Sequence, residues 1–148
     1  MNYTVIVPFY NEEKNVLSFN DGLINNLKNI VNTDRSFEII YVDDGSKDKT
    51  FEELKKLNSN IFETIIIKHR TNLSQSAALN TGISQSKYEN LIIMDGDLQN
   101  DPSDLVNMVN EYEKGADMII GWRKNRKDNF FTKTIPSVIA NYIVRVFS

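Results

Sequence analysis

Short stretches rich in β-branched and aromatic side chains alternate along the chain with segments of helical periodicity, and this alternation constrains the fold most. Each apolar stretch is near-continuous, which is typical of strands covered on both faces. Strands are expected at residues 3–9, 37–43, 65–69, 91–95 and 118–122. The order predicts an α/β fold with a largely parallel sheet, right-handed crossovers and helices on both faces. In such sheets, ligands bind beyond the carboxyl ends of the strands.

Four helices are expected between these strands. The first begins at Asn11 as its N-cap, with Glu12 and Glu13 in the opening turn, where the helix dipole favours anions. Its apolar stripe recurs every three or four residues and consists of Val16, Phe19, Leu23, Leu27 and Ile30. The others are expected over 49–57, preceded by Ser46 and Asp48; over 74–83, where Ala77 and Ala78 permit close packing; and after the cap Asp101, from Pro102 until Gly115.

The composition excludes several classes of protein. The chain has 148 residues, 41% of them hydrophobic, which is enough for one domain with its own core. It has no cysteine, so disulfides, thiolate zinc sites and thiol nucleophiles are excluded and a reducing compartment is favoured. No apolar stretch approaches the ~20 residues of a membrane span, and the N-terminus lacks the pattern of a secretory signal.

Asp95 and Asp97 follow the fourth expected strand directly, on either side of Gly96. Residues two apart in an extended segment point to the same side, and the glycine permits a tight turn and the approach of a ligand. Two carboxylates on one side suit Mg²⁺ or Mn²⁺, and Mg²⁺ completes its coordination with water and substrate phosphates. The alternative is a solvated turn that leads into a helix.

A second pair of carboxylates, Asp43 and Asp44, follows the second expected strand. Such carboxylates accept hydrogen bonds from ribose hydroxyls or base N–H groups. One of them could cap the next helix instead, but Ser46 or Asp48 can fill that role and leave both free. The single histidine, His69, is expected to be structural or to line the pocket, because no nucleophile elbow is present. The glycine-rich dinucleotide fingerprint and the P-loop are absent from the sequence.

At these residues the sequence resembles the family-two glycosyltransferases with the GT-A fold. It is most similar to the polyprenyl-phosphate group, which includes dolichol-phosphate mannosyltransferase and the bacterial undecaprenyl-phosphate transferases. The resemblance rests on VIVPFYNEEKNV (5–16), VDDGSKDKT (42–50), RTNLSQSAALNTGI (70–83) and IIMDGDLQNDPSDL (92–105). It implies a Rossmann-like GT-A domain over residues 1–126, with a mostly parallel sheet and helices on both faces.

The resemblance also implies roles for individual residues. The nucleotide would be bound by Pro8, Tyr10, Glu12, Asp43, Asp44 and Arg70. The metal ion that bridges the donor diphosphate would be bound by Asp95, Asp97 and Gln99, and the acceptor phosphate would face Arg123, Arg126, Lys133 and Ser137. The catalytic residues would be Asp95, Asp97 and Arg123. Relatives often have glycine where Ser74 stands, and this departure weakens the inference of a close backbone approach there.

The implied reaction is the inverting transfer of a sugar from a nucleoside-diphosphate sugar to a polyprenyl phosphate. The Mg²⁺ or Mn²⁺ ion would stabilise the charge on the leaving group as the anomeric bond breaks. The acceptor phosphate is already anionic, so it needs cations such as Arg123 rather than a general base. Asp44 could meet uracil or guanine, and the bacterial character of the chain favours a UDP-sugar over GDP-mannose.

Charge is distributed unevenly along the chain. Residues 1–122 carry 11 Lys and Arg against 19 Asp and Glu, whereas residues 123–148 carry 6 basic residues against Asp128 alone. The basic end favours an anionic partner, with a solvated basic face as the alternative. Residues 127–148 also carry apolar residues at roughly helical spacing. This pattern predicts either a basic amphipathic helix on a membrane surface or a packing helix.

The apolar pattern continues to Ser148 without a cap, so we expect a truncated chain that binds the donor and lacks turnover. An exposed apolar face on such a chain could drive self-association into a homo-oligomer. The expected location is the cytoplasmic face of the membrane, and no nucleic-acid partner is expected.

Three other functions are compatible with parts of this pattern. A glycosyltransferase acting on a polysaccharide or sugar hydroxyl would need a catalytic base, such as an aspartate beyond residue 148. A sugar-nucleotide-binding module would keep the donor site without turnover. A nucleotidyltransferase would need a basic, glycine-rich loop after the first strand, whereas Asn11, Glu12 and Glu13 stand there.

Overall fold

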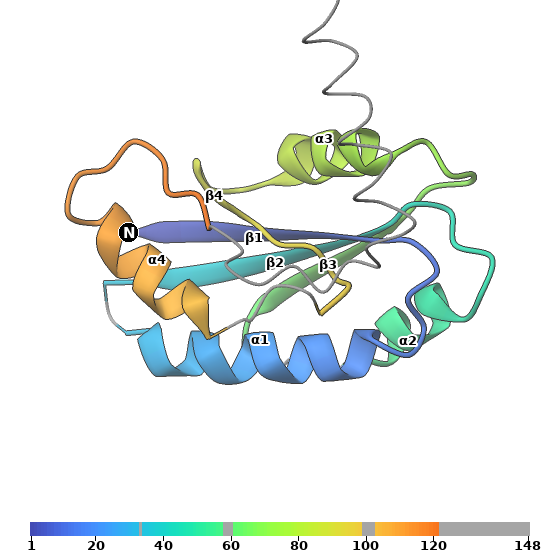
Figure 1. Cartoon of the computed structure of the whole chain (residues 1–148), viewed down its shortest axis with the longest axis horizontal. Coiled ribbons are helices and arrows are strands. Elements are labelled where there is room, and N and C mark those ends of the chain that lie inside the picture. Colours follow the sequence, from blue (N-terminus) through green and yellow to red (C-terminus); the bar gives the residue numbers. More distant parts are fainter. Residues whose placement is uncertain (33, 58–60, 99–102, 122–148) are drawn as a thin grey trace, which may run out of the picture.

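A parallel sheet forms the centre of the structure, a computed structural model that describes residues 1–32, 34–57, 61–98 and 103–121. Its four strands have the order β3-β2-β1-β4 (Figure 1). They are β1 (Asn2–Phe9), β2 (Ser36–Asp43), β3 (Glu63–Lys68) and β4 (Asn90–Ile93). The first three strands follow one another outward, and β4 returns to the other side of β1. The strand order therefore reverses at β1, and in α/β sheets this switch point is where ligands bind.

Helices cover both faces of the sheet, as expected. They are α1 (Val16–Ile30), α2 (Thr50–Lys56), α3 (Gln75–Gln85) and α4 (Asp104–Tyr112). Figure 1 shows α1, α2 and α4 below the sheet and α3 above it. Because right-handed crossovers in opposite directions place their helices on opposite faces, α3 is separated from α1 and α2. Within the described ranges, no helix combines the length and apolar character needed to cross a bilayer.

The larger part of the core lies between the sheet and α1. The stripe expected from the sequence is buried in full: Val16, Phe19, Leu23, Leu27 and Ile30. It packs against alternate residues of β1 and β2, including Tyr3, Val5, Val7, Phe9, Phe37, Ile39 and Tyr41. On the opposite face, Ala78 of α3 packs against Ile40 and Val42. This burial on both faces explains why the strands are near-continuous apolar stretches.

The prediction of a fifth strand over 118–122 is wrong for residues 118–121, the part of this range that the structure describes. Residues 118–121 have no strand conformation. A strand needs a neighbour to bond its backbone N–H and C=O groups, and in the described part of the chain β4 pairs only with β1. The side chains of Met118 and Ile120 are correspondingly 73% and 80% exposed. Trp122, like the expected helix-capping residues Asp101 and Pro102, lies outside the described residues.

The expected start of the first helix is also wrong. The helix begins at Val16, with Asn15 at the N-cap position. Asn11 has a left-handed backbone with φ of 56°, and its side chain accepts a hydrogen bond from the backbone N–H of Lys47 (2.8 Å) instead. Asparagine tolerates left-handed backbone better than most residues. Asn11 therefore connects two loops and does not cap a helix.

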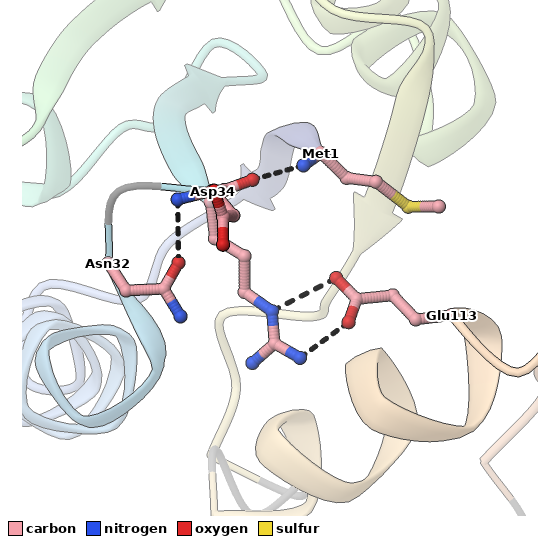
Figure 2. A pocket seen from close by; sticks show the side chains of 5 residues that line it. Met1, Asn32, Asp34 and Glu113 are labelled. Carbon is pink, nitrogen blue, oxygen red and sulfur yellow. Dashed lines mark hydrogen bonds and ion pairs between the residues drawn. The ribbon is translucent and has the colours of Figure 1, made fainter.

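An ion pair joins the residue before β2 to the residue after α4, at the amino side of the sheet. Arg35 Nε lies 3.0 Å from Glu113 Oε1 and its Nη2 lies 2.5 Å from Oε2, and the Tyr3 hydroxyl donates to the same carboxylate at 2.8 Å. Figure 2 shows this pair beside an open pocket lined by Met1, Asn32, Asp34, Arg35 and Glu113. The hydrogen bonds from Arg35 hold the pKa of Glu113 below its ordinary value, although burial acts in the opposite direction.

This pair should stabilise the fold above the pKa of Glu113. Glu113→Gln replaces the charge that both Arg35 and Tyr3 bond, so we expect it to lower the free energy of unfolding by about 1–2 kcal/mol at pH 7. As the pH falls below the ordinary glutamate pKa of about 4.3 and through the lower pKa of the folded state, the contribution is lost and the two proteins converge. Urea denaturation at several pH values measures both effects.

Glu111→Gln is the matched control on the same helix. Glu111 pairs with Lys114 at 2.6 Å in an exposed geometry, so its loss should cost no more than about 0.5 kcal/mol. Equal effects of the two substitutions would contradict the importance of the Arg35–Glu113 pair.

Candidate functional site

The described residues predicted to bind a nucleotide and a metal ion lie at or just beyond the carboxyl ends of the four strands. In the parallel register, Phe9 at the end of β1 pairs with Asp43 at the end of β2, and Ile6 of β1 pairs with Ile93 at the end of β4. The segments that continue from these ends therefore leave the sheet at one edge. This edge includes the switch point between β1 and β4, and it is opposite to the Arg35–Glu113 pair.

The β1–α1 and β2–α2 loops are joined by hydrogen bonds at this edge. Each bond pairs a backbone N–H of one segment with a side-chain oxygen of the other, so the two loops hold each other directly. The bonds run from Asn11 N to Ser46 Oγ (2.9 Å), Glu12 N to Thr50 Oγ1 (2.8 Å), Glu13 N to Asp48 Oδ2 (3.1 Å), Lys47 N to Asn11 Oδ1 (2.8 Å) and Lys49 N to Glu13 Oε2 (3.0 Å). The loops that carry Tyr10, Glu12 and Asp44 form one unit.

Asp44 is buried and joins the end of β2 to the loop between β3 and α3. Asp44 is 2% exposed, and its carboxylate accepts four hydrogen bonds. The donors are His69 Nδ1 (2.7 Å) and Leu73 N (3.0 Å) to Oδ1, with Asn72 Nδ2 (3.0 Å) and Ser74 N (2.9 Å) to Oδ2. A carboxylate has about four lone-pair positions, and the chain itself occupies all of them at Asp44.

These bonds set the protonation state of Asp44. Burial alone raises the pKa of a carboxyl group, but the hydrogen bonds from Leu73, His69 and Ser74 outweigh it and hold the pKa of Asp44 below its ordinary value. A carboxylate only accepts, so His69 carries a proton on Nδ1, while its Nε2 lies 2.9 Å from the Thr81 hydroxyl. The ring is thus held on both sides, which agrees with the structural one of the two roles expected for His69.

The expectation that Asp43 and Asp44 are both left free of the chain is wrong. Asp48 does bond the start of α2, through the Thr50 N–H (3.0 Å), as expected. Asp44 is nevertheless fully bonded, and Asp43 Oδ1 accepts from the Ser46 N–H (3.0 Å). Asp43 Oδ2, in contrast, is buried with no hydrogen-bond donor among the described residues, and Lys68 Nζ lies 3.8 Å away. Buried polar atoms are seldom left in this state, and because the Asp43 side chain is 0% exposed, a ligand would reach this oxygen only if the side chains around it moved.

Asp95 and Asp97 leave the end of β4 in a half-buried turn. Asp95 Oδ1 accepts a hydrogen bond from Gln75 Nε2 of α3 at 2.6 Å. Between them, Gly96 lies against the ring of Phe9: a Cβ at this position would be 2.3 Å from Phe9 Cε1. The glycine is thus required by contact with the core, a reason that the sequence alone did not suggest. Its packing anchors the aspartate pair to the end of β1.

The chemistry of this pair suits a divalent cation. In the described ranges, no group of three or more His, Cys, Asp or Glu side chains could hold a metal ion by itself. Mg²⁺, however, is commonly bound by one or two carboxylates and completed by substrate phosphates and water. Asp95 and Asp97 therefore fit a metal ion that arrives with a diphosphate. Gln99, the third expected ligand, lies outside the described residues.

The remaining predicted site residues are distributed as follows. Tyr10 and Arg70 are exposed at the same edge of the sheet, while Pro8 and Glu12 are half-buried there. Glu12 Oε2 bonds Asn15 Nδ2, and its carbonyl accepts from the Asn15 N–H. The residues expected to face the acceptor phosphate lie outside the described residues: Arg123, Arg126, Lys133 and Ser137. The same holds for the segment 127–148 and its expected helix.

The structure adds residues that the sequence analysis did not select. Asn72 and Gln75 bond Asp44 and Asp95 respectively. Both lie in the stretch 70–83 on which the family resemblance partly rests, beside the unusual Ser74. The serine at position 74 could have drawn attention to Asn72 and Gln75. A residue other than glycine at such a backbone turn indicates that neighbouring contacts hold the turn.

Comparison with known proteins gives a consistent result. The sequence model of Glycosyl transferase family 2 matches residues 4–146. The chain is 37% identical to dodecaprenyl-phosphate galacturonate synthase of Rhizobium johnstonii, over 97% of this chain and 42% of that protein. It is 32% identical to undecaprenyl-phosphate 4-deoxy-4-formamido-L-arabinose transferase of Proteus mirabilis, over 96% of this chain and 43% of that protein. The chain thus spans less than half the length of these curated relatives.

Solved structures confirm the expected α/β fold of the GT-A type. TarS of S. aureus matches with a TM-score of 0.55 and 26% identity, over 76% of this chain and 33% of that chain. Mannosyltransferase PcManGT from Pyrobaculum calidifontis, in complex with GDP-Man and Mn²⁺, matches with a TM-score of 0.59 and 25% identity, over 72% of this chain and 31% of that chain.

Asp44→Asn should destabilise the protein strongly. The carboxamide cannot accept at both of its positions, so N–H donors of the 72–74 loop lose their acceptor, and we expect a loss of about 2–4 kcal/mol in the free energy of unfolding. Because the pKa of Asp44 is lowered in the folded state, this contribution is present above the ordinary aspartate pKa of about 3.9 and disappears as the pH falls through the folded value. Asp21→Asn on the exposed side of α1 is the control, with an expected change within about 0.5 kcal/mol.

Thermal and urea unfolding between pH 3 and pH 8 test this assignment. A wild-type stability in Asp44→Asn at neutral pH would show that the four hydrogen bonds do not hold the loop.

Proposed function

The chain belongs to glycosyl transferase family 2, and from this premise we propose that it takes part in the metal-dependent, inverting transfer of a sugar from a nucleoside-diphosphate sugar to a polyprenyl phosphate. The observation that carries the proposal is the aspartate pair beyond β4, next to β1 at the point where strand order reverses. A structural relative with the same fold was solved in complex with GDP-Man and Mn²⁺.

In this proposal, Asp95 and Asp97 hold Mg²⁺ or Mn²⁺ against the donor diphosphate, with Gln99 as a further ligand. When bound there, the ion supplies positive charge to the leaving group as the anomeric bond breaks. Gly96 contributes by packing on Phe9, so that both aspartates start from a fixed backbone. The acceptor attacks from the opposite face of the sugar ring, which inverts the anomeric centre.

The nucleotide is proposed to lie along the ends of β1 and β2. Asp43 is a candidate for a contact, because its Oδ2 lacks a hydrogen-bond donor among the described residues, but this contact requires the side chains that enclose the oxygen to move. A ribose hydroxyl or base N–H would supply that donor. Tyr10 and Arg70 are exposed at the same edge and available to the base. The other proposed contributors are Pro8 and Glu12, together with Asp44, which would act indirectly by holding the loop between β3 and α3 through its four bonds.

A polyprenyl phosphate is the proposed acceptor. Two relatives are named for dodecaprenyl-phosphate and undecaprenyl-phosphate substrates. A phosphate oxygen is anionic near neutral pH, so the protein must supply cations rather than a general base. Arg123 would act in this way as a catalytic residue, together with Arg126, Lys133 and Ser137. In the same proposal, residues 127–148 lie on the cytoplasmic surface of the membrane.

Removing either aspartate should abolish the metal-dependent part of nucleotide binding. We expect UDP and GDP to bind more tightly with Mn²⁺ than with EDTA, with UDP preferred, and we expect Asp95→Asn and Asp97→Asn to reduce binding to the EDTA level. Isothermal titration calorimetry on the 148-residue chain measures both affinities. Asp104→Asn, an exposed aspartate at the start of α4, is the control. Unchanged affinity in both site variants would contradict the metal assignment.

The acceptor can be tested by following radiolabelled sugar from the donor. Incubation of the full-length protein with the labelled donor and polyprenyl phosphate should transfer the label into the lipid fraction. Label that enters only a polysaccharide would support a transferase acting on sugar hydroxyls. Nucleotide binding without any transfer would support a binding module.

A further inference from the structure

Gln75 connects α3 to the aspartate pair beyond β4. It is the first residue of α3, on one face of the sheet, and its Nε2 donates to Asp95 Oδ1 at 2.6 Å. The two residues are 20 positions apart in sequence and belong to different elements. A short hydrogen bond to a carboxylate is among the stronger side-chain interactions, and it restricts the rotation of the group that accepts it.

The backbone at the start of α3 is held in a conformation that few residues adopt. Ser74, the N-cap, has φ of 117°, which is in the region where glycine is favoured. Such backbone conformations persist only when the surrounding contacts determine them. Here the Ser74 N–H donates to Asp44 Oδ2 at 2.9 Å, and its hydroxyl accepts from the Ala77 N–H at 3.4 Å. Gln75 therefore follows directly from a turn that a buried carboxylate holds.

The part of the loop that leads into this turn is also in close contact with Gly45. Gly45 has φ of 70°, and a Cβ there would lie 2.3 Å from the carbonyl carbon of Thr71. The backbone of the β3–α3 loop thus rests on the end of β2, with Asp44 bonding it on one side. The position of Gln75 is determined by these contacts rather than by its own exposed side chain.

We propose that Gln75 is a positioning residue that orients the carboxylate of Asp95 for a divalent cation and the diphosphate bound to it. The proposal rests on the proposed function. A neutral amide is suited to this task, because it fixes the carboxylate plane and leaves the negative charge of Asp95 in place. A lysine or arginine at the same distance would neutralise that charge. Partners that orient metal ligands in this way typically affect metal affinity by about 10–100-fold.

Gln75→Leu tests the proposal, because it keeps a similar size and removes the donor. The affinity for UDP or GDP is measured by calorimetry with Mn²⁺ and with EDTA, and Mn²⁺ binding in the presence of the nucleotide is followed by electron paramagnetic resonance. We expect the Mn²⁺-dependent gain in nucleotide affinity to fall about tenfold, while the affinity in EDTA and the thermal midpoint stay unchanged. Gln85→Leu, at the other end of α3, is the matched control and should behave as wild type.

The outcomes separate this proposal from the proposed function. If wild type gains affinity with Mn²⁺ and Gln75→Leu gains equally, the positioning role is overturned and the proposed function stands. An equal loss with Mn²⁺ and with EDTA would also overturn it, because Gln75 would then act on the nucleotide or on the fold. If wild type gains nothing from Mn²⁺, both proposals fail together.

Discussion

A buried carboxylate carries a large desolvation cost unless donors surround it, and Asp44 meets this requirement with four hydrogen bonds from one loop. That loop begins after β3 and ends at the first turn of α3. Asp44 thus connects the end of β2 to a helix on the opposite side of the sheet from α1 and α2. The left-handed turn at Ser74 and the contact between Gln75 and Asp95 both follow from this connection.

Acidic residues gathered at one edge of a sheet would repel one another without compensation. Among the described residues, the hydrogen-bond donors to these carboxylates are mainly neutral groups. Asp44 is bonded by backbone and amide N–H groups and a histidine, Asp43 by a backbone N–H, and Asp95 by an amide. Lys68 is the cation near Asp43, at 3.8 Å. Neutral donors stabilise carboxylates and leave their charge for a ligand, which is consistent with a site for a cation and a diphosphate.

The sequence predicted the layers of the fold because they depend on burial. Four of the strands and the stripe of α1 are visible as apolar patterns; β1, β2 and the stripe are buried as expected, whereas β3 and β4, on the outer sides of the described sheet, are only partly buried. The predictions that were wrong or missing concern residues whose contacts are made with segments distant in sequence. Asparagine is a residue type that often caps helices, but the Asn11 side chain accepts its hydrogen bond from the backbone N–H of Lys47 in another loop. The partners of Asp44, and the contact of Gln75 with Asp95, cannot be read from spacing, since they depend on how α3 meets the sheet.

The place of β1 in the sheet has a consequence for synthesis on the ribosome. Of the four described strands, β1 is made first, yet it lies inside the sheet, and one of its neighbours, β4, begins only at Asn90. Until that point, a nascent chain presents one edge of an apolar strand with unbonded N–H and C=O groups, which is the kind of edge that other chains can pair with. Translation speed and chaperone access before β4 emerges therefore bear on the yield of this protein.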